Sequence, residues 1–300
     1  MQQENTDVTF VSPVDYDSTL GLETNSPFKR FINLFFVPIL NNLPKDFKHK
    51  IKKTNNAAAE VIDNVTNHNA LEALYKKGRH FSTKNILKKF FRYVWFNIDN
   101  SKGVRNRLKF VIREIRNHLQ EISTKDKEVN IISIASGSSR AVIETVRDGH
   151  YLKDAKISLT FLDKNPEAIE YSKKLSKEIS HPNIKLEWIN DTVGNYFKSK
   201  PTKRFDVVEM VGLLDYFKDE KVLDIFKNIY DLLQEGGILI TANVSHNKEE
   251  RFITNILDWP MIYRTPCELA SLVHKAGFDY NNIKAFYEPL KVHGLVVAKK

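Results

Sequence analysis

The chain has 300 residues, of which 42% are hydrophobic and 28% are charged. This composition supports a folded core and excludes disordered, collagen-like and coiled-coil chains. The one cysteine, Cys267, excludes an internal disulfide and a thiolate metal cluster, and no two of the nine histidines have the helical spacing of a metal site. We therefore expect no metal, and a cytoplasmic protein of the reducing compartment.

Positive charge is concentrated in one part of the chain. Residues 1–27 contain five acidic and no basic side chains, residues 28–125 carry 21 basic and 7 acidic ones (net +14), and residues 126–300 carry 25 of each. The acidic start does not fit a signal peptide, and the longest apolar run, 31–40, is half of the ~20 residues that span a bilayer. We expect a flexible acidic N-terminus (1–27), a basic helical region (28–125) and a neutral domain (126–300), with no integral membrane segment.

The basic region predicts helices separated by short breaks. Segment 28–40 is aromatic and apolar, and segment 46–53 is basic. Apolar side chains three and four residues apart predict longer helices over 83–97 and 101–122. In the second of these helices, most of the basic side chains, Arg105 and Arg107 among them, fall outside the apolar stripe.

Strands and helices alternate after residue 128. Short apolar runs predict strands over 131–135, 157–162, 184–189, 205–210 and 238–242, and two closing strands near 282–287 and 294–298. Such alternation indicates an α/β fold, with a doubly wound, mostly parallel, seven-stranded sheet between two helical layers. The loop between the closing strands is too short for a parallel crossover, so we expect these two strands to be antiparallel.

Small residues follow the first strand, and an acid ends the second. The loop Ser136-Gly137-Ser138-Ser139 would let a ligand approach the backbone beside a helix N-terminus. Asp163 follows Gly137 by 26 residues, close to the spacing at which an acid accepts hydrogen bonds from ribose hydroxyls. The simpler alternative is a small-residue turn beside a surface aspartate.

Five segments in order resemble the class I S-adenosylmethionine-dependent methyltransferases. They are the first strand and its loop, Phe161–Pro166, Asn190–Thr192, Phe205–Tyr216 and Leu232–Leu239. The resemblance implies a Rossmann-like methyltransferase fold with an N-terminal helical lid, and S-adenosyl-L-methionine as cofactor. It assigns cofactor binding to Ser133, Ala135, Ser136, Gly137, Asp163, Lys164, Asn190, Asp191, Thr192 and Val211, and places Asp215 and Tyr216 in the loop that faces the methyl group.

Three positions depart from the family pattern. Ser133 stands where an acid is frequent, and Ala135 and Ser139 replace two of the three usual loop glycines. Ala135 fits if its φ is negative, and Ser139 fits if the helix begins there. The block Gly212–Tyr216, with Trp259, Ile262–Thr265 and Glu268-Leu269, also resembles bacterial enzymes of 3-hydroxypalmitic acid methyl ester biosynthesis.

Several side chains are candidates for the acceptor side. In methyl transfer a protein mainly aligns the nucleophile, with a base only where the acceptor must lose a proton. We assign Asp215 as that base and Tyr216 to substrate orientation. Substrate-binding candidates are Arg105 (or Arg107), Asn243, Tyr263 and Arg264, the arginines because guanidinium groups bind carboxylates. Loop hydrogen bonding, packing and surface ion pairs are the structural alternatives for these residues.

We therefore predict an enzyme, a methyltransferase acting on the oxygen or nitrogen of a small acceptor. The basic surplus favours a carboxylate or a lipid-like molecule, with peripheral membrane contact through segment 28–53. The alternatives are an RNA methyltransferase, an aminocarboxypropyl transferase, a non-catalytic cofactor-binding protein, and a serine hydrolase with Ser139 as nucleophile. Nucleic acid is less favoured, because no Asn/Asp-Pro-Pro-aromatic motif follows the fourth strand. The oligomeric state stays open.

Overall fold

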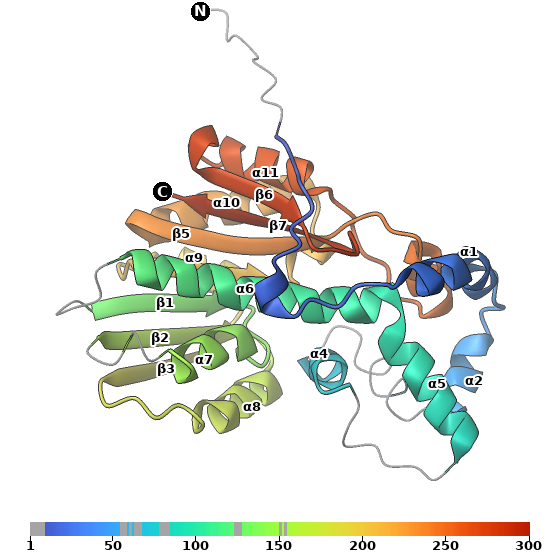
Figure 1. Cartoon of the computed structure of the whole chain (residues 1–300). Helices are drawn as coiled ribbons and strands as arrows, with labels where there is room; N and C mark the ends of the chain where they lie inside the picture. The colour runs from blue at the N-terminus through green and yellow to red at the C-terminus, as the bar shows by residue number, and fades with distance from the viewer. Residues whose placement is uncertain are drawn as a thin grey trace, which may run out of the picture.

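The computed structural model describes residues 10–54, 68–77, 85–122, 128–149 and 155–300, together with residues 59, 62 and 152. Seven strands form one sheet in the order β3-β2-β1-β4-β5-β7-β6 (Figure 1). They are β1 (Glu128–Ile134), β2 (Lys156–Asp163), β3 (Ile184–Asn190), β4 (Phe205–Val211), β5 (Leu233–Val244), β6 (Ile283–Tyr287) and β7 (His293–Lys299). The first five strands are parallel, and β7 runs antiparallel to both β5 and β6. The predicted sheet is confirmed, including its antiparallel closing pair.

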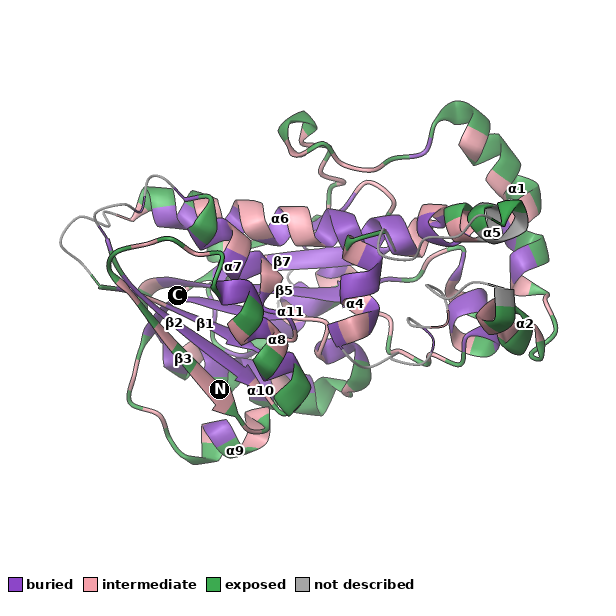
Figure 2. Cartoon of the chain, turned by 90° about the horizontal axis from the view of Figure 1, so that it is seen from below, coloured by how far each residue is buried: buried purple, intermediate pink, exposed green. Residues whose placement is uncertain are grey.

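Helices cover both faces of the sheet. Those after β1 are α7 (Arg140–Arg147), α8 (Pro166–Ser176), α9 (Val193–Lys198), α10 (Asp219–Leu232) and α11 (Pro266–Lys275). One apolar core lies between the sheet and α7 and α8, and a second lies under α10 and α11. Most residues of β1, β2 and β5 are buried, so these strands are mostly purple in Figure 2, and their buried stretches read as apolar runs in the sequence. Side chains cap the N-termini of two of these helices: Asn165 caps α8, and Thr265 forms a capping box with Glu268 at α11.

The basic region is helical, as predicted. Its described helices are α1 (Pro27–Asn41), α2 (Phe47–Thr54), α4 (His68–Tyr75), α5 (Ile86–Asn97) and α6 (Asp99–Glu121). The expected start of the 83–97 helix, at 83–84, lies outside the described residues. Helix α6 packs on the same sheet face as α7, whereas Leu40, Trp95 and Val104 form a third core with η4 (Phe252–Ile256), a single π-helical turn after β5. The N-terminal helices therefore rest on the loop that follows β5.

Residues 10–27, which we expected to be flexible, run along α6 (Figure 1). Arg113 of α6 contacts Asp15 at 2.8 Å and Asp17 at 3.1 Å, and Glu23 accepts a 2.6 Å hydrogen bond from Nε of Arg105. In the sequence, an acidic block (1–27) precedes a basic block (28–125). The fold places the two side by side, so part of the +14 charge is neutralised within the chain itself.

Candidate functional site

A cavity of about 830 Å³ lies between the carboxyl ends of the strands and the N-terminal helices. Its sheet side comes from the segments that follow β1, β2, β3 and β4. Its other side comes from α4 and α5, which lie beyond the strand ends in Figure 1, and from the N-terminal half of α6. Of the predicted cofactor residues, it is lined by Ala135, Gly137, Asp163, Lys164, Asp191, Thr192 and Val211. Position along the sheet brings these residues together, because parallel strands end at a common edge.

The loop after β1 is built from left-handed residues. Gly137 has φ +54°, Ala135 has φ +52° and Ser139 has φ +57°, so Ala135 does not take the negative φ that its fit to the loop required, and Ser139 precedes the helix as its left-handed N-cap. Non-glycine residues adopt this conformation at a cost of about 1–2 kcal/mol each. Asp163 supports the strained turn, since its Oδ2 accepts the Gly137 N–H at 2.8 Å.

Asp163 is anchored and still has acceptor capacity. Its Oδ1 accepts the Asn165 N–H at 2.8 Å, in addition to the bond from Gly137. A carboxylate has about four lone-pair sites, so two of them remain for a ligand in the cavity that Asp163 lines. Asn190 does not line the cavity; its Nδ2 donates to the Asp163 carbonyl at 3.0 Å.

Ser133 and Ser136 lie behind the cavity wall. The Ser133 hydroxyl donates to Glu209, its register partner in β4, and burial raises the pKa of Glu209 to about 7. The neighbouring strand thus supplies the carboxyl that the family frequently has at position 133. The Ser136 Oγ is buried and has no partner among the described residues.

Four buried polar atoms without a partner in the described part of the chain belong to side chains that line the cavity. They are Nδ1 of His68, Nε1 of Trp95, Nε of Arg107 and Nδ1 of His293. Unpaired buried polar atoms are rare in folded proteins, because each costs about 1–3 kcal/mol. Their convergence on one cavity fits a polar ligand. Of these four residues the sequence offered only Arg107 as a candidate, and positions 68, 95 and 293 carry no motif of the family.

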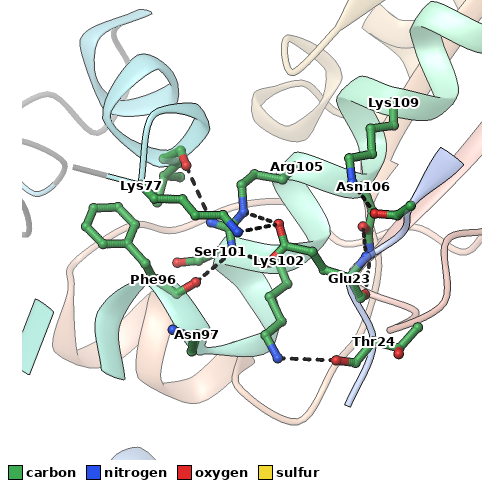
Figure 3. Close-up of polar contacts among 12 residues, drawn as sticks. Glu23, Thr24, Lys77, Phe96, Asn97, Ser101, Lys102, Arg105, Asn106 and Lys109 are labelled. Carbon is green, nitrogen blue, oxygen red and sulfur yellow. Dashed lines mark hydrogen bonds and ion pairs between the residues drawn. The ribbon is translucent and has the colours of Figure 1, made fainter. Parts of the chain in front are cut away.

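Arg107, rather than Arg105, faces the cavity. The two residues lie about 200° apart around α6, so they point to nearly opposite sides of the helix. Arg105 donates to Glu23 and to the carbonyls of Phe96 and Leu74, and so joins residues 10–27 to α4 and α5 (Figure 3). Arg107 is 4% exposed and lies close to Gly212, where an added Cβ would be 3.8 Å from its Nη1.

Asp215 and Tyr216 line the cavity from η3 (Leu214–Tyr216). Burial raises the pKa of Asp215 above its ordinary value, although the Val244 N–H, which donates to its Oδ1 at 2.8 Å, and the charge of Arg107 oppose the rise. The Tyr216 hydroxyl accepts from Nε1 of Trp259 at 2.9 Å. Asp215 thus combines the loop role and the cavity position that the sequence left as alternatives.

The other predicted substrate residues lie outside the cavity. Arg264 is 3% exposed and donates to the Leu214 carbonyl at 3.1 Å, to Asp219 and to Oδ1 of Asn243. Tyr263 contacts the Thr254 hydroxyl through its own hydroxyl. Arg264 and Asn243 therefore brace the η3 segment, which is how they position Asp215.

An ion pair between Glu72 and Arg140 joins α4 to the start of α7, next to the loop that follows β1. Nε and Nη2 of Arg140 donate to the Glu72 carboxylate at 2.9 and 2.6 Å, and the Tyr171 hydroxyl donates to it at 2.6 Å. Burial alone would raise the pKa of Glu72, but the hydrogen bonds and charge of Arg140 lower it below its ordinary value. His68, on the same helix, lies against Gly137, at 3.6 Å between the His68 Cβ and a Cβ built on the glycine.

We expect Glu72→Gln to lower the free energy of unfolding by about 2 kcal/mol, because it removes the buried carboxylate that accepts from both Arg140 and Tyr171, while Glu144 remains as the second charge partner of Arg140. The same stabilisation should be present above the ordinary glutamate pKa and be lost as the pH falls through the depressed folded-state pKa. Urea denaturation and hydrogen exchange of residues 68–77 measure both. Glu144→Gln, which affects the more exposed second partner of Arg140, is the matched control and should cost less than about 1 kcal/mol.

A family model described as "Putative methyltransferase" matches residues 66–288. Among solved structures, the chain is similar to a possible exported protein from Bordetella parapertussis (14% identity, 92% of this chain and 99% of the other, TM-score 0.64). It is also similar to magnesium protoporphyrin IX methyltransferase from Synechocystis PCC 6803 with bound SAH (9%, 75% and 93%, TM-score 0.51) and to apo SibL, an S-adenosylmethionine-dependent methyltransferase (14%, 78% and 69%, TM-score 0.51). No curated protein sequence matches the chain.

The family match covers well over half of the chain, so the chain belongs to this methyltransferase family. The family match, together with the shared fold, confirms the methyltransferase resemblance, whereas the narrower resemblance to methyl ester biosynthesis enzymes stays a prediction. The hydrolase alternative finds no support, because Ser139 is 3% exposed and its hydroxyl accepts a 2.9 Å hydrogen bond from Ser172.

Proposed function

We propose that the protein is an S-adenosylmethionine-dependent methyltransferase that methylates a small, largely apolar acceptor carrying an anionic group. The observation that carries the proposal is that one cavity of about 830 Å³ joins a polar sheet side to a mostly apolar helical side. When bound, the cofactor supplies a methyl group already activated on a sulfonium. The protein residues then have to hold, orient and shield the reactants.

The sheet side fits the cofactor. Asp163 retains acceptor sites for ribose hydroxyls, and Gly137 leaves the backbone of the β1 loop open beside it. Asp191 and Thr192 at the end of β3 provide the adenine end, as the family resemblance implies. The unpaired Nε of Arg107 is a donor for a carboxylate, either that of the cofactor or that of the acceptor.

The helical side fits the acceptor. Its wall is apolar and comes from α4, α5, α6, η3, η4 and the segment after η4: Leu71, Leu74, Trp95, Ile98, Val104, Leu213, Ile253, Leu257, Trp259 and Met261. Burial of apolar acceptor surface there, at about 25 cal/mol per Å², favours binding and excludes water from the reacting atoms. Arg107, Asp215 and His293 are the polar groups at the boundary. Burial and the nearby Arg107 charge hold the pKa of His293 well below its ordinary value, so its imidazole is neutral at neutral pH.

We assign Asp215, which lines the cavity, the role of taking a proton from the acceptor. We expect Asp215→Asn to lower kcat about 10²-fold, at the low end for a general base because the methyl donor is already activated. A base acts only when it is deprotonated, so wild-type activity should fall as the pH drops through the raised pKa of Asp215, and the variant should lose that limb of the profile. The measurement is the pH dependence of kcat. Asp219→Asn is the control for indirect effects on η3. It removes the negative charge that pairs with Arg264, and Asp219 does not line the cavity.

Calorimetry with S-adenosylmethionine and S-adenosylhomocysteine tests the function before any acceptor is known. Binding of both by the folded protein is expected, and absence of binding to either ligand would refute the proposal. An acceptor screen that includes fatty acids and aromatic carboxylic acids then follows. The product distinguishes the transferred group, because methyl transfer releases S-adenosylhomocysteine whereas aminocarboxypropyl transfer releases methylthioadenosine.

A further inference from the structure

The outward face of α1 is apolar. Six large side chains on this helix of 15 residues are between 38% and 73% exposed: Phe28, Phe31, Ile32, Leu34, Phe35 and Ile39. They make up six of the thirteen exposed large hydrophobic side chains in the described part of the chain. Helix α1 lies at the end of the molecule remote from the sheet and is mostly green or pink in Figure 2. Surface helices normally turn polar residues outward, so this face has the character of a binding surface.

The inner face of α1 is fixed to the fold. Val37 and Leu40 are buried, and Asn41 both donates to the Lys248 carbonyl at 2.8 Å and accepts the Phe252 N–H at 2.9 Å. These contacts hold α1 on η4. Because the inner face is already used, the outward phenylalanines cannot be buried by rotating the helix, and no described segment of the chain covers them.

Basic residues accompany the apolar face. Residues 28–53 contain seven lysines and arginines and one aspartate, a net charge of +6, and most of these cations lie on α2 or just before it. No helix among the described residues is long and apolar enough to cross a bilayer. An apolar face with flanking cations on a helix too short to span is the pattern of a helix that lies in the plane of a membrane interface.

Charge also selects among partners. A second copy of the chain would bring two segments of +6 together, which opposes association. Nucleic acid would pair with the lysines but would leave the phenylalanines and isoleucines uncovered. An anionic lipid surface satisfies both features, because acyl chains accept the aromatic side chains and head groups accept the cations.

We propose that α1 docks on an anionic lipid bilayer, with Phe31 and Phe35 inserted at the interface and the basic residues of 29–53 beside the head groups. The rings of Phe31 and Phe35 lie 5.5 Å apart, so they form one continuous apolar contact. The η4 turn contacts α1 and also contributes Ile253 to the cavity wall. A bilayer docked on α1 would therefore be separated from the apolar side of the cavity by α1 and η4. Membrane binding does not depend on the methyltransferase activity proposed above.

Co-sedimentation of the full chain with vesicles tests this surface. We expect binding to vesicles of equal parts phosphatidylcholine and phosphatidylglycerol, and little binding to phosphatidylcholine alone. Phe31→Ser/Phe35→Ser should weaken the partition coefficient at least about 10-fold through lost apolar burial, and Lys52→Gln/Lys53→Gln should weaken it roughly fivefold for each residue that contacts the head groups. The matched control is Val11→Ser/Tyr16→Ser, because these two side chains are also well exposed (78% and 60%) but lie on the segment along α6.

Three outcomes would overturn the proposal. One is the absence of wild-type binding to the anionic vesicles, and another is equal loss of binding in the Phe31→Ser/Phe35→Ser and Val11→Ser/Tyr16→Ser variants. The third is a dimer, detected by light scattering, that the Phe31→Ser/Phe35→Ser change abolishes while vesicle binding is unaffected. Circular dichroism and thermal unfolding establish that each variant is folded. Neither binding nor light scattering requires an acceptor, so failure here is distinguishable from failure of the proposed enzyme activity.

Discussion

Replacing Arg107 with methionine is expected to weaken anion binding in the cavity about 10³-fold, which corresponds to roughly 4 kcal/mol. Arg107 is 4% exposed, and although its guanidinium shares a hydrogen bond with Tyr75, its Nε has no partner among the described residues and can donate to a ligand in the cavity. Charge-assisted hydrogen bonds in a buried site are the strong ones, because water does not compete with them. Methionine keeps the length and apolar stem of the side chain and removes the guanidinium.

Two measurements assign the anion. If Arg107 binds the carboxylate of the cofactor, calorimetry will register the loss in the affinity for S-adenosylhomocysteine. If it binds the acceptor, that affinity will stay near the wild-type value and the acceptor KM will rise. Arg116→Met, on the same helix but outside the cavity, is the matched control and should leave both unchanged. Unchanged affinity together with unchanged KM in Arg107→Met would show that the arginine is only structural.

The choice between Arg105 and Arg107 marks the limit of what the sequence could predict. Periodicity placed both arginines outside the apolar stripe of α6, but the partners of each residue come from other parts of the chain. Arg105 donates hydrogen bonds to Glu23 and to one carbonyl each of α4 and α5. Such long-range pairs leave no local pattern, and the same holds for the packing of residues 10–27 on α6.

The sheet, and the meeting of Asp163 with the loop after β1, could be predicted because their signals are local. Parallel strands buried on both faces read as continuous apolar runs, and Asp163 follows Gly137 at a spacing that one βαβ unit imposes. The acceptor half could not be predicted, because His68 and Trp95 reach the cavity only through the packing of α4 and α5. Likewise, we predicted from the sequence that Arg264 binds substrate, whereas in the fold its guanidinium donates to the carbonyls of Leu214 and Phe217.

Asp163→Ala is expected to weaken binding of S-adenosylmethionine and S-adenosylhomocysteine about 10³-fold. Two hydrogen bonds to a charged group contribute about 1.5–3 kcal/mol each, and the carboxylate has two lone-pair sites left after its bonds to Gly137 and Asn165. The change acts in a second way, because the left-handed turn at Ala135–Gly137 loses the acceptor that fixes it. Isothermal titration calorimetry gives the affinity, and the free energy of unfolding gives the loop contribution.

The comparison with Asp163→Asn separates these two contributions. Asparagine keeps one acceptor oxygen for the Gly137 N–H, so the loop should hold while the charge is lost, and we expect an intermediate fall in affinity with little loss of stability. Asp231→Ala, on the exposed side of α10, removes an equal charge far from the cavity and should change neither quantity. If Asp163→Asn bound both ligands as tightly as the wild type, the ribose assignment of Asp163 would be wrong, and the carboxylate would serve only to hold the turn in which Gly137 lies.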